Sequence, residues 1–378
     1  MQLCGNTRGL VAFILLFLNM GDRVVWADSP PPKALGSFKP LLVSETPCPD
    51  PQIFHDGSDW YIFGTAAQPF FLQGRELGPG KMRQASLDID YGDFKYPVLH
   101  VWGLIVEREK DGRCYAYATL HLGNIRTVIA AFVPRDNARW EPGKPITRWR
   151  LAKVLIGDVA RDDCSYYESK IIREANGSRH LMYVARLGRD NHILLQRMKS
   201  PTELDSAAAP RLLLRPSGYP SEDRNGPGSM QLVEGPSIIR LNDKYVLLYS
   251  VGDYLLNNYK LGMAFSDALI PPAGQTYRTV KQTIPKSSRE LGTTREEIAY
   301  LLQSEYPERP NYVANAVVGP GLGSVVEING KPWLFFHGYK PDDHVRNPQN
   351  RFVFRVPLLV SIDRGEPRLD WLRPELAK

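Results

Sequence analysis

One pattern recurs five times along the chain: an apolar run, a short polar turn and a second apolar run that is rich in aromatic residues. The five turns are centred on Asp56-Gly57, Asp111-Gly112, Asn176-Gly177, Asn242-Asp243 and Asn329-Gly330. Four of these pairs are Asx-Gly, the dipeptide that supplies the positive φ angles of tight β-hairpins. The sequence therefore predicts five copies of one hairpin.

The spacing of the turns predicts how the hairpins assemble. Successive turns lie 55, 65, 66 and 87 residues apart, which leaves room for four strands and their loops in each repeat. Four-stranded sheets arranged radially leave only short, protected edges, which is the β-propeller architecture. We expect an all-β, five-bladed β-propeller that forms a single domain over residues 48–378. A β-sandwich is the alternative, but it does not require the same hairpin at such long intervals.

Composition supports this fold class and limits the partners. The chain has 31 Gly and 31 Pro among 378 residues, which suits many short strands joined by turns. Its 43% apolar content allows a large core and excludes a disordered chain. The formal net charge is +6, but the basic residues are scattered, so we expect no nucleic-acid partner.

The first 27 residues have the pattern of a signal peptide. Arg8 precedes an apolar run from Leu10 to Met20, and the small residues Val25 and Ala27 precede Asp28. We therefore expect a secreted or periplasmic protein with no membrane span after leader removal; the alternative is an uncleaved N-terminal anchor. Residues 28–47 are Pro-rich and are expected to run extended over the surface. Residues 293–306 begin with Thr and an early Glu297, which predicts one short helix.

Three acids stand at the start of predicted hairpins. Asp50 precedes Pro51, Glu168 precedes the third hairpin, and Glu234 precedes Gly235-Pro236. The innermost strands of a propeller start at one end of its central channel, so these acids are expected to converge. A protonated and an ionised carboxyl group facing each other are what glycosidic bond cleavage needs, and a third raises the pKa of the acid. The alternative is that they are ordinary turn residues.

Over most of its length the sequence resembles glycoside hydrolase family 43. The resemblance rests on the Asp-Pro and Glu-Gly-Pro starts, on "HVWG" (100–103), on "GPGLGSVVEINGKPWLFFHGYK" (319–340) and on Arg351. It implies a five-bladed propeller that hydrolyses arabinosyl, xylosyl and related linkages with inversion. By this resemblance Asp50 is the general base, Glu234 is the general acid, and Glu168 tunes the pKa of the acid and holds it.

The sequence departs from that family at two places. The tuning residue of the family is usually Asp before Pro, whereas Glu168 precedes Ser169, and the nearby Asp162 and Asp163 are alternatives for the role. Leu322 stands where many members have a His that faces a central metal or a water cluster, so we expect no metal and no cofactor. Cys48 and Cys164 both lie just upstream of a proposed channel acid, which makes them the candidate disulfide pair.

A sugar pocket needs aromatic faces for the ring and planar donors for hydroxyl groups. The candidate substrate-binding residues are Trp102, Tyr166, Phe70, His337 and Arg351. For Trp102 and Phe70 the alternative is a place in the blade core, and for His337 it is a satisfied buried position. The sequence thus predicts an exported, inverting glycoside hydrolase that acts on oligosaccharide or polysaccharide. The alternative is a propeller that binds carbohydrate without catalysis.

Overall fold

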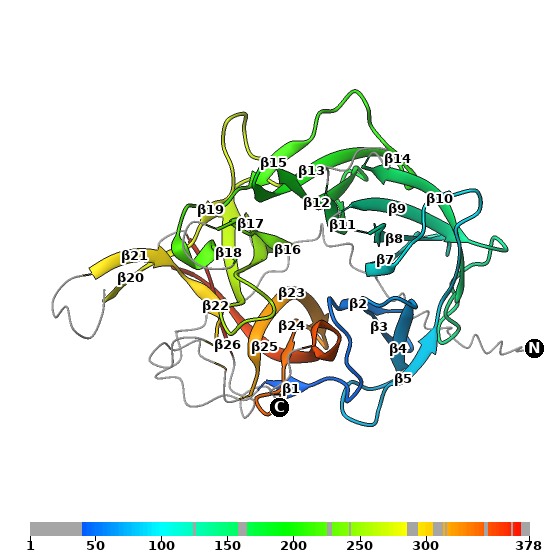
Figure 1. The fold of residues 1–378 in the computed structure, drawn as a ribbon, viewed down its shortest axis with the longest axis horizontal. Coiled ribbons are helices and arrows are strands. Elements are labelled where there is room, and N and C mark those ends of the chain that lie inside the picture. Colours follow the sequence, from blue (N-terminus) through cyan, green and yellow to red (C-terminus); the bar gives the residue numbers. More distant parts are fainter. Residues whose placement is uncertain are drawn as a thin grey trace, which may run out of the picture.

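The computed structural model describes residues 40–371 except 124–125, 158–164, 225–228, 242, 286–293, 305–312, 314–315, 344–346 and 364–365. The predicted leader, residues 28–39, and the residues Asp162, Asp163 and Cys164 lie outside this part of the chain. Within it, five β-sheets surround a common centre, so the predicted five-bladed propeller is confirmed (Figure 1).

The five predicted hairpins form the inner half of the five blades. Their first strands lie nearest the centre in Figure 1: β2 (Gln52–His55), β7 (His100–Arg108), β11 (Tyr166–Arg173), β16 (Glu234–Leu241) and β23 (Val318–Ile328). Each pairs antiparallel with the next strand of the chain: β3 (Trp60–Phe63), β8 (Cys114–His121), β12 (Arg179–Leu187), β17 (Lys244–Val251) and β24 (Lys331–Tyr339). Asn329 and Gly330 have φ angles of 52° and 75°, as the Asx-Gly turn predicts.

The outer strands complete each blade. Blade 1 adds β4 (Phe70–Gly74) and β5 (Arg83–Ser86), and blade 2 adds β9 (Thr127–Pro134), β10 (Arg148–Ile156) and the parallel β6 (Asp88–Asp90). Blade 3 adds β13 (Asp190–Ser200), β14 (Glu203–Leu204) and β15 (Arg211–Leu214), and blade 4 adds β18 (Lys260–Ser266), β19 (Arg278–Thr279) and β22 (Tyr300–Leu302). Blade 5 adds β25 (Phe352–Asp363), β26 (Glu366–Trp371) and β1 (Leu41–Leu42). Two short 3-10 turns, η1 (Pro220–Glu222) and η2 (Pro348–Asn350), lie in connections.

Blade 5 closes the ring with strands from distant parts of the chain. Leu41 and Leu42 of β1 pair antiparallel with Arg355 and Phe354 of β25. Val43 follows them into the core and is fully buried. Part of the Pro-rich segment 28–47 is therefore a strand of the propeller, where the sequence predicted only an extended surface segment.

The predicted helix at 293–306 is wrong. Thr294–Ile298 is strand β21, which pairs with β20 (Lys281–Pro285) in a hairpin that projects from the propeller in Figure 1. Tyr300–Leu302 is β22, which joins β18 of blade 4. Ile298, Tyr300 and Leu302 are buried in these sheets, so pairing with an existing strand outweighs a weak local helix preference.

Apolar clusters between neighbouring blades hold the ring together. Between blades 3 and 4, for example, Val184 packs in one cluster with Val233 and Leu247. Burial of one such side chain contributes about 1.5–3 kcal/mol. Cys48 and Cys114 are buried free thiols, so the structure does not show the expected pairing of Cys48 with Cys164. Among the described residues, no helix has the length and apolar character needed to cross a membrane.

Candidate active site

Each blade has a residue in the left-handed backbone region within the first half of its inner strand or, in blade 1, two residues before that strand. These residues are Asp50 (φ 54°), Gly103 (56°), Glu168 (53°), Gly235 (61°) and Leu322 (48°). In β7, β11, β16 and β23 the pairing with the second strand shifts register at this residue, which is the mark of a β-bulge. A non-glycine residue in this region costs about 1–3 kcal/mol, so Asp50, Glu168 and Leu322 store strain at the mouth of the channel.

The bulges refine the predicted alignment of the three acids. Asp50 and Glu168 both occupy the left-handed position of their strands, as the sequence predicts. Glu234 lies one residue earlier, because the left-handed position of its strand is Gly235. The prediction of one shared position is therefore correct for two acids and wrong for Glu234.

We expect Gly235→Ala to destabilise the fold by about 2–3 kcal/mol, because a Cβ at Gly235 meets the Leu322 Cγ at 2.7 Å and the left-handed backbone adds strain. Gly330→Ala is the matched control, since Gly330 has a similar φ angle and open space around its Cβ position. Urea unfolding of both variants checks the expectation. Equal losses in the two would show that Gly235 is needed only for its backbone angle.

In four blades, the backbone N–H of the left-handed residue donates a hydrogen bond to a side chain of the preceding blade, which we call its cap. The backbone N–H of Gly103 donates to Thr65 Oγ1 (3.1 Å), that of Glu168 to Thr119 Oγ1 (2.9 Å), that of Leu322 to Ser250 Oγ (2.8 Å) and that of Asp50 to His337 Nδ1 (2.9 Å). Thr119, Ser250 and His337 each stand opposite the residue before the left-handed one in their own blade. The caps thus link each blade to the next.

Blade 3 lacks such a cap. Val184 stands opposite Tyr167, the residue before Glu168, so it occupies the position of Thr119, Ser250 and His337. A valine offers no acceptor to the N–H of Gly235 in blade 4. That N–H donates instead to the Glu168 carboxylate, at 2.5 Å from Oε2. Because blade 3 has no cap, the Glu168 carboxylate is free to accept the hydrogen bond of the Gly235 N–H, the peptide group that follows Glu234.

We expect Val184→Thr to release Glu168, because the introduced hydroxyl can accept the Gly235 N–H. A crystal structure of the variant checks the new bond, and Val246→Thr in β17 controls for a hydroxyl in the core. An unchanged Glu168–Gly235 bond in the variant would contradict the role assigned to Val184.

Asp50 is buried against a guanidinium and an imidazole. Arg351 Nη1 lies 2.9 Å from Asp50 Oδ1, and Nη2 lies 3.4 Å from Oδ2. His337 Nε2 lies 3.2 Å from Arg351 Nη1. Burial, together with the Arg351 charge, holds the pKa of His337 well below its usual range, so the ring is neutral. Arg351 and His337, both predicted as substrate-binding residues, hold Asp50 in the structure.

Glu234 accepts two phenol hydrogen bonds. The Tyr259 hydroxyl donates to Oε1 at 2.7 Å, and the Tyr167 hydroxyl donates to Oε2 at 3.2 Å. Burial raises the pKa of Glu234, against the Tyr259 bond and the Arg224 charge, which lower it; the charge of Asp50 raises it further. The carboxyl group therefore keeps its proton to a higher pH than an ordinary glutamate.

Glu168 has its pKa raised well above the usual range. Burial is the largest cause, followed by the charges of Glu234 and Asp50, while the bond from Gly235 N–H lowers it. The three acids thus interact electrostatically although they come from blades 1, 3 and 4. This convergence is what the propeller topology predicts from their places at strand starts.

The remaining predicted pocket residues divide into two groups. Trp102 is partly buried near the acids, stacked on His121 (5.0 Å between ring centroids) and edge-on to Tyr167 (6.3 Å). Phe70 is 8% exposed and lies in a core cluster, and Tyr166 packs against Tyr183 in another. The structure therefore places Phe70 and Tyr166 in the blade cores.

Sequence reasoning missed the tyrosines that hold Glu234. Tyr167 is adjacent to Tyr166 in sequence, and strand alternation turns successive side chains to opposite faces, so a one-residue shift selected the wrong ring. Tyr259 stands just before β18, and the sequence carries no signal that links it to Glu234.

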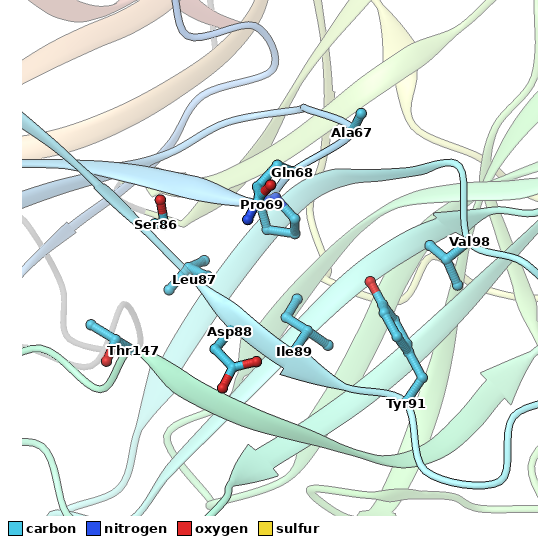
Figure 2. Close-up of a pocket in the computed structure, with 10 residues that line it drawn as sticks. All are labelled: Ala67, Gln68, Pro69, Ser86, Leu87, Asp88, Ile89, Tyr91, Val98 and Thr147. Atoms are coloured by element: carbon cyan, nitrogen blue, oxygen red, sulfur yellow. The ribbon is translucent and has the colours of Figure 1, made fainter.

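The larger of two cavities in the described part of the chain does not lie at the three acids. A hollow of about 670 Å³ opens between blades 1 and 2, and Figure 2 shows its lining, which includes Pro69, Ile89, Tyr91 and Val98 but none of the predicted site residues. A cavity of about 10 Å³ lies instead beside Glu168 and Leu322. Among the described residues no group of three or more His, Cys, Asp or Glu side chains is placed to hold a metal ion.

Solved structures with similar folds were found by comparison. A thermostable family-43 glycoside hydrolase is 19% identical and aligns with a TM-score of 0.63 over 90% of this chain and 96% of that one. An α-L-arabinofuranosidase from Lactobacillus brevis is 17% identical, with a TM-score of 0.62 over 85% and 93%. A Cellvibrio cellulosa α-L-arabinanase complexed with arabinohexaose is 20% identical, with a TM-score of 0.58 over 88% and 97%. No protein-family model and no curated protein sequence matches the chain. At these identities the likeness establishes the shared five-bladed fold.

Proposed function

We propose that the chain is an exported, inverting glycoside hydrolase that cleaves arabinofuranosyl, xylosyl or related linkages. The observation that carries the proposal is the convergence of Asp50, Glu168 and Glu234 at one end of the channel, with a raised pKa on two of them. Inverting hydrolysis needs an ionised carboxylate that activates water and a protonated carboxyl group that donates its proton to the leaving oxygen. The fold shared with family-43 hydrolases supports the same reaction class.

The contacts suggest how the roles are divided. Asp50 is the general base, because the Arg351 guanidinium pairs with its ionised form. Glu234 is the general acid, because burial favours its protonated form. Glu168 holds the Gly235 peptide, and the charge of Asp50 opposes ionisation of Glu234. Trp102 offers an aromatic face to a sugar ring beside these groups.

One observation favours a second candidate, a propeller that binds carbohydrate without catalysis. Both phenol bonds to Glu234 and the charge of Arg224 stabilise the ionised carboxylate, whereas a general acid must hold its proton until it protonates the leaving oxygen. Under this alternative the same pocket binds sugar and no bond is broken.

A substrate panel separates the two candidates. Wild-type protein is incubated with aryl arabinofuranosides, aryl xylosides and the corresponding oligosaccharides, with Glu234→Gln as the blank and calorimetry as the binding assay. Turnover by the wild type and none by the blank supports hydrolysis. Binding with no turnover by either protein supports the second candidate and overturns the first.

Export is supported by the leader pattern of residues 1–27, which lie outside the described residues. Mass spectrometry of the protein recovered from a secreting bacterial host should give an N-terminus at Asp28. A mature protein that retains Met1 would overturn this part of the proposal.

A further inference from the structure

A second ring of side chains lies two residues beyond the left-handed ring. Its members are Gln52, Ile105, Lys170, Ser237 and Ser324, each two positions after Asp50, Gly103, Glu168, Gly235 and Leu322 respectively. The bulge interrupts the alternation of the strand, so it is the contacts of the side chains that join three of these residues: the Lys170 ammonium donates to Gln52 and to Ser324. Lys170 is the one charged residue of this described ring.

Lys170 connects three blades across the channel. Its ammonium donates to Gln52 Oε1 of blade 1 and, at 3.1 Å, to Ser324 Oγ of blade 5. Gln52 Nε2 in turn donates to the backbone carbonyl of Asp50 at 3.4 Å. Lys170 itself follows Glu168 by two residues in blade 3. One side chain thus links the strands that carry Asp50, Glu168 and Leu322.

Two carboxyl groups act on Lys170. The charges of Glu168 and of Glu107 of β7 both favour the ammonium form, and Glu107 is itself paired with Arg173 of β11 at 3.0 Å. The small cavity beside Lys170 has about 10 Å³ of space, enough for roughly one water molecule. The ammonium of the half-buried Lys170 is therefore held by protein groups of blades 1 and 5.

We propose that Lys170 is a positioning residue of the active site, whose ammonium fixes the inner strands of blades 1, 3 and 5 and supplies the positive charge beneath the carboxylates. The inference rests on the proposed function for its effect on turnover, but the state of Lys170 is measurable without any substrate. A lysine that served packing alone would not need to stay charged.

The charge of Lys170 is lost at moderately alkaline pH. Burial lowers the pKa of Lys170 to about 8, against the charges of Glu168 and Glu107, which raise it. The ammonium is therefore present below about pH 8, and its hydrogen bonds and charge weaken as the pH rises through that value. The alkaline fall of kcat/KM should include this step.

The direct test is an NMR titration of the full chain labelled with ¹³C at the lysine Cε carbons. The Lys170 signal is assigned by its loss in Lys170→Met and by its persistence in Lys153→Met, which removes an exposed lysine of β10. We expect a midpoint near pH 8, which moves lower in Glu168→Gln because an attractive charge is lost. A midpoint that does not respond to Glu168→Gln would overturn the proposal, because the ammonium would then not interact with the acids.

The activity test separates positioning from stability. Lys170→Met should lower kcat/KM about tenfold or more and remove the fall near pH 8, because the titrating ammonium is no longer present. Lys170→Arg keeps the charge and should restore part of the rate while removing the fall near pH 8. If the pH profile of kcat/KM for Lys170→Met has the same shape as that of the wild type, Lys170 has only a structural role and the proposal is overturned. If the wild type turns over no glycoside, the proposed function fails while the NMR titration still decides the state of Lys170.

Discussion

Replacing Glu234 by Gln should lower kcat on an oligosaccharide about 10³-fold or more, because general acid catalysis contributes roughly 10²–10⁴-fold and the amide has no proton to give. The amide carbonyl can still accept the Tyr259 hydrogen bond, so the fold is expected to remain intact. The loss should be much smaller on an aryl glycoside with a strongly acidic phenol, since that leaving group needs no protonation. Steady-state kinetics on both substrates measure the difference.

Glu141→Gln provides the control for Glu234→Gln. Glu141 is exposed and its carboxylate pairs with the exposed Lys144, so its replacement should leave both kcat and thermal stability unchanged. The raised pKa of Glu234 also predicts that the alkaline limb assigned to this group disappears in Glu234→Gln. Equal losses on good and poor leaving groups would contradict the assignment of Glu234 as the acid.

Replacing Asp50 by Asn should abolish hydrolysis to a similar extent, about 10³-fold, but with equal losses on good and poor leaving groups. The reason is that the base acts on water, whichever group departs. Asn is the suitable replacement because it tolerates the left-handed backbone of Asp50. The change also leaves the buried Arg351 without its ionic partner, so the free energy of unfolding should fall by about 1–3 kcal/mol.

Arg351→Lys separates charge from geometry at Asp50. Lysine keeps the positive charge but cannot make the two contacts that Arg351 makes with the Asp50 carboxylate. Kinetics and urea unfolding of Asp50→Asn, with Arg351→Lys beside it, measure both effects. Full activity of Asp50→Asn on any glycoside would remove Asp50 from the mechanism.

The sequence predicts the fold well because its strongest signals are local. An Asx-Gly pair such as Asn329-Gly330 fixes a tight turn wherever it lies, and four such pairs together with Asn242-Asp243, at long intervals, define five blades. The failure at Thr294–Ile298 has the opposite cause. A helix pattern over a dozen residues is weak evidence against a neighbouring strand that offers pairing and burial.

The sequence predicts the three acids of the candidate site, but it does not predict the residues that hold them in place. Asp50, Glu168 and Glu234 are recognisable because topology brings strand starts together. Val184 matters because it has no hydrogen-bond acceptor at a position where Thr119, Ser250 and His337 have one. That comparison between blades requires the strand register, which the sequence alone does not supply. The contacts of Lys170 with Gln52 and Ser324 join residues 118 and 154 positions apart, and only the folded ring places them together.

The most direct test of the account is a time-resolved ¹H NMR spectrum of the first products that the wild-type protein releases from an arabinofuranosyl or xylosyl oligosaccharide. Inverting hydrolysis by Asp50 and Glu234 predicts that the inverted anomer appears first, that mutarotation then adds the other anomer, and that Glu234→Gln and Asp50→Asn give neither. Release of the retained anomer first, or unchanged release by either variant, would contradict it.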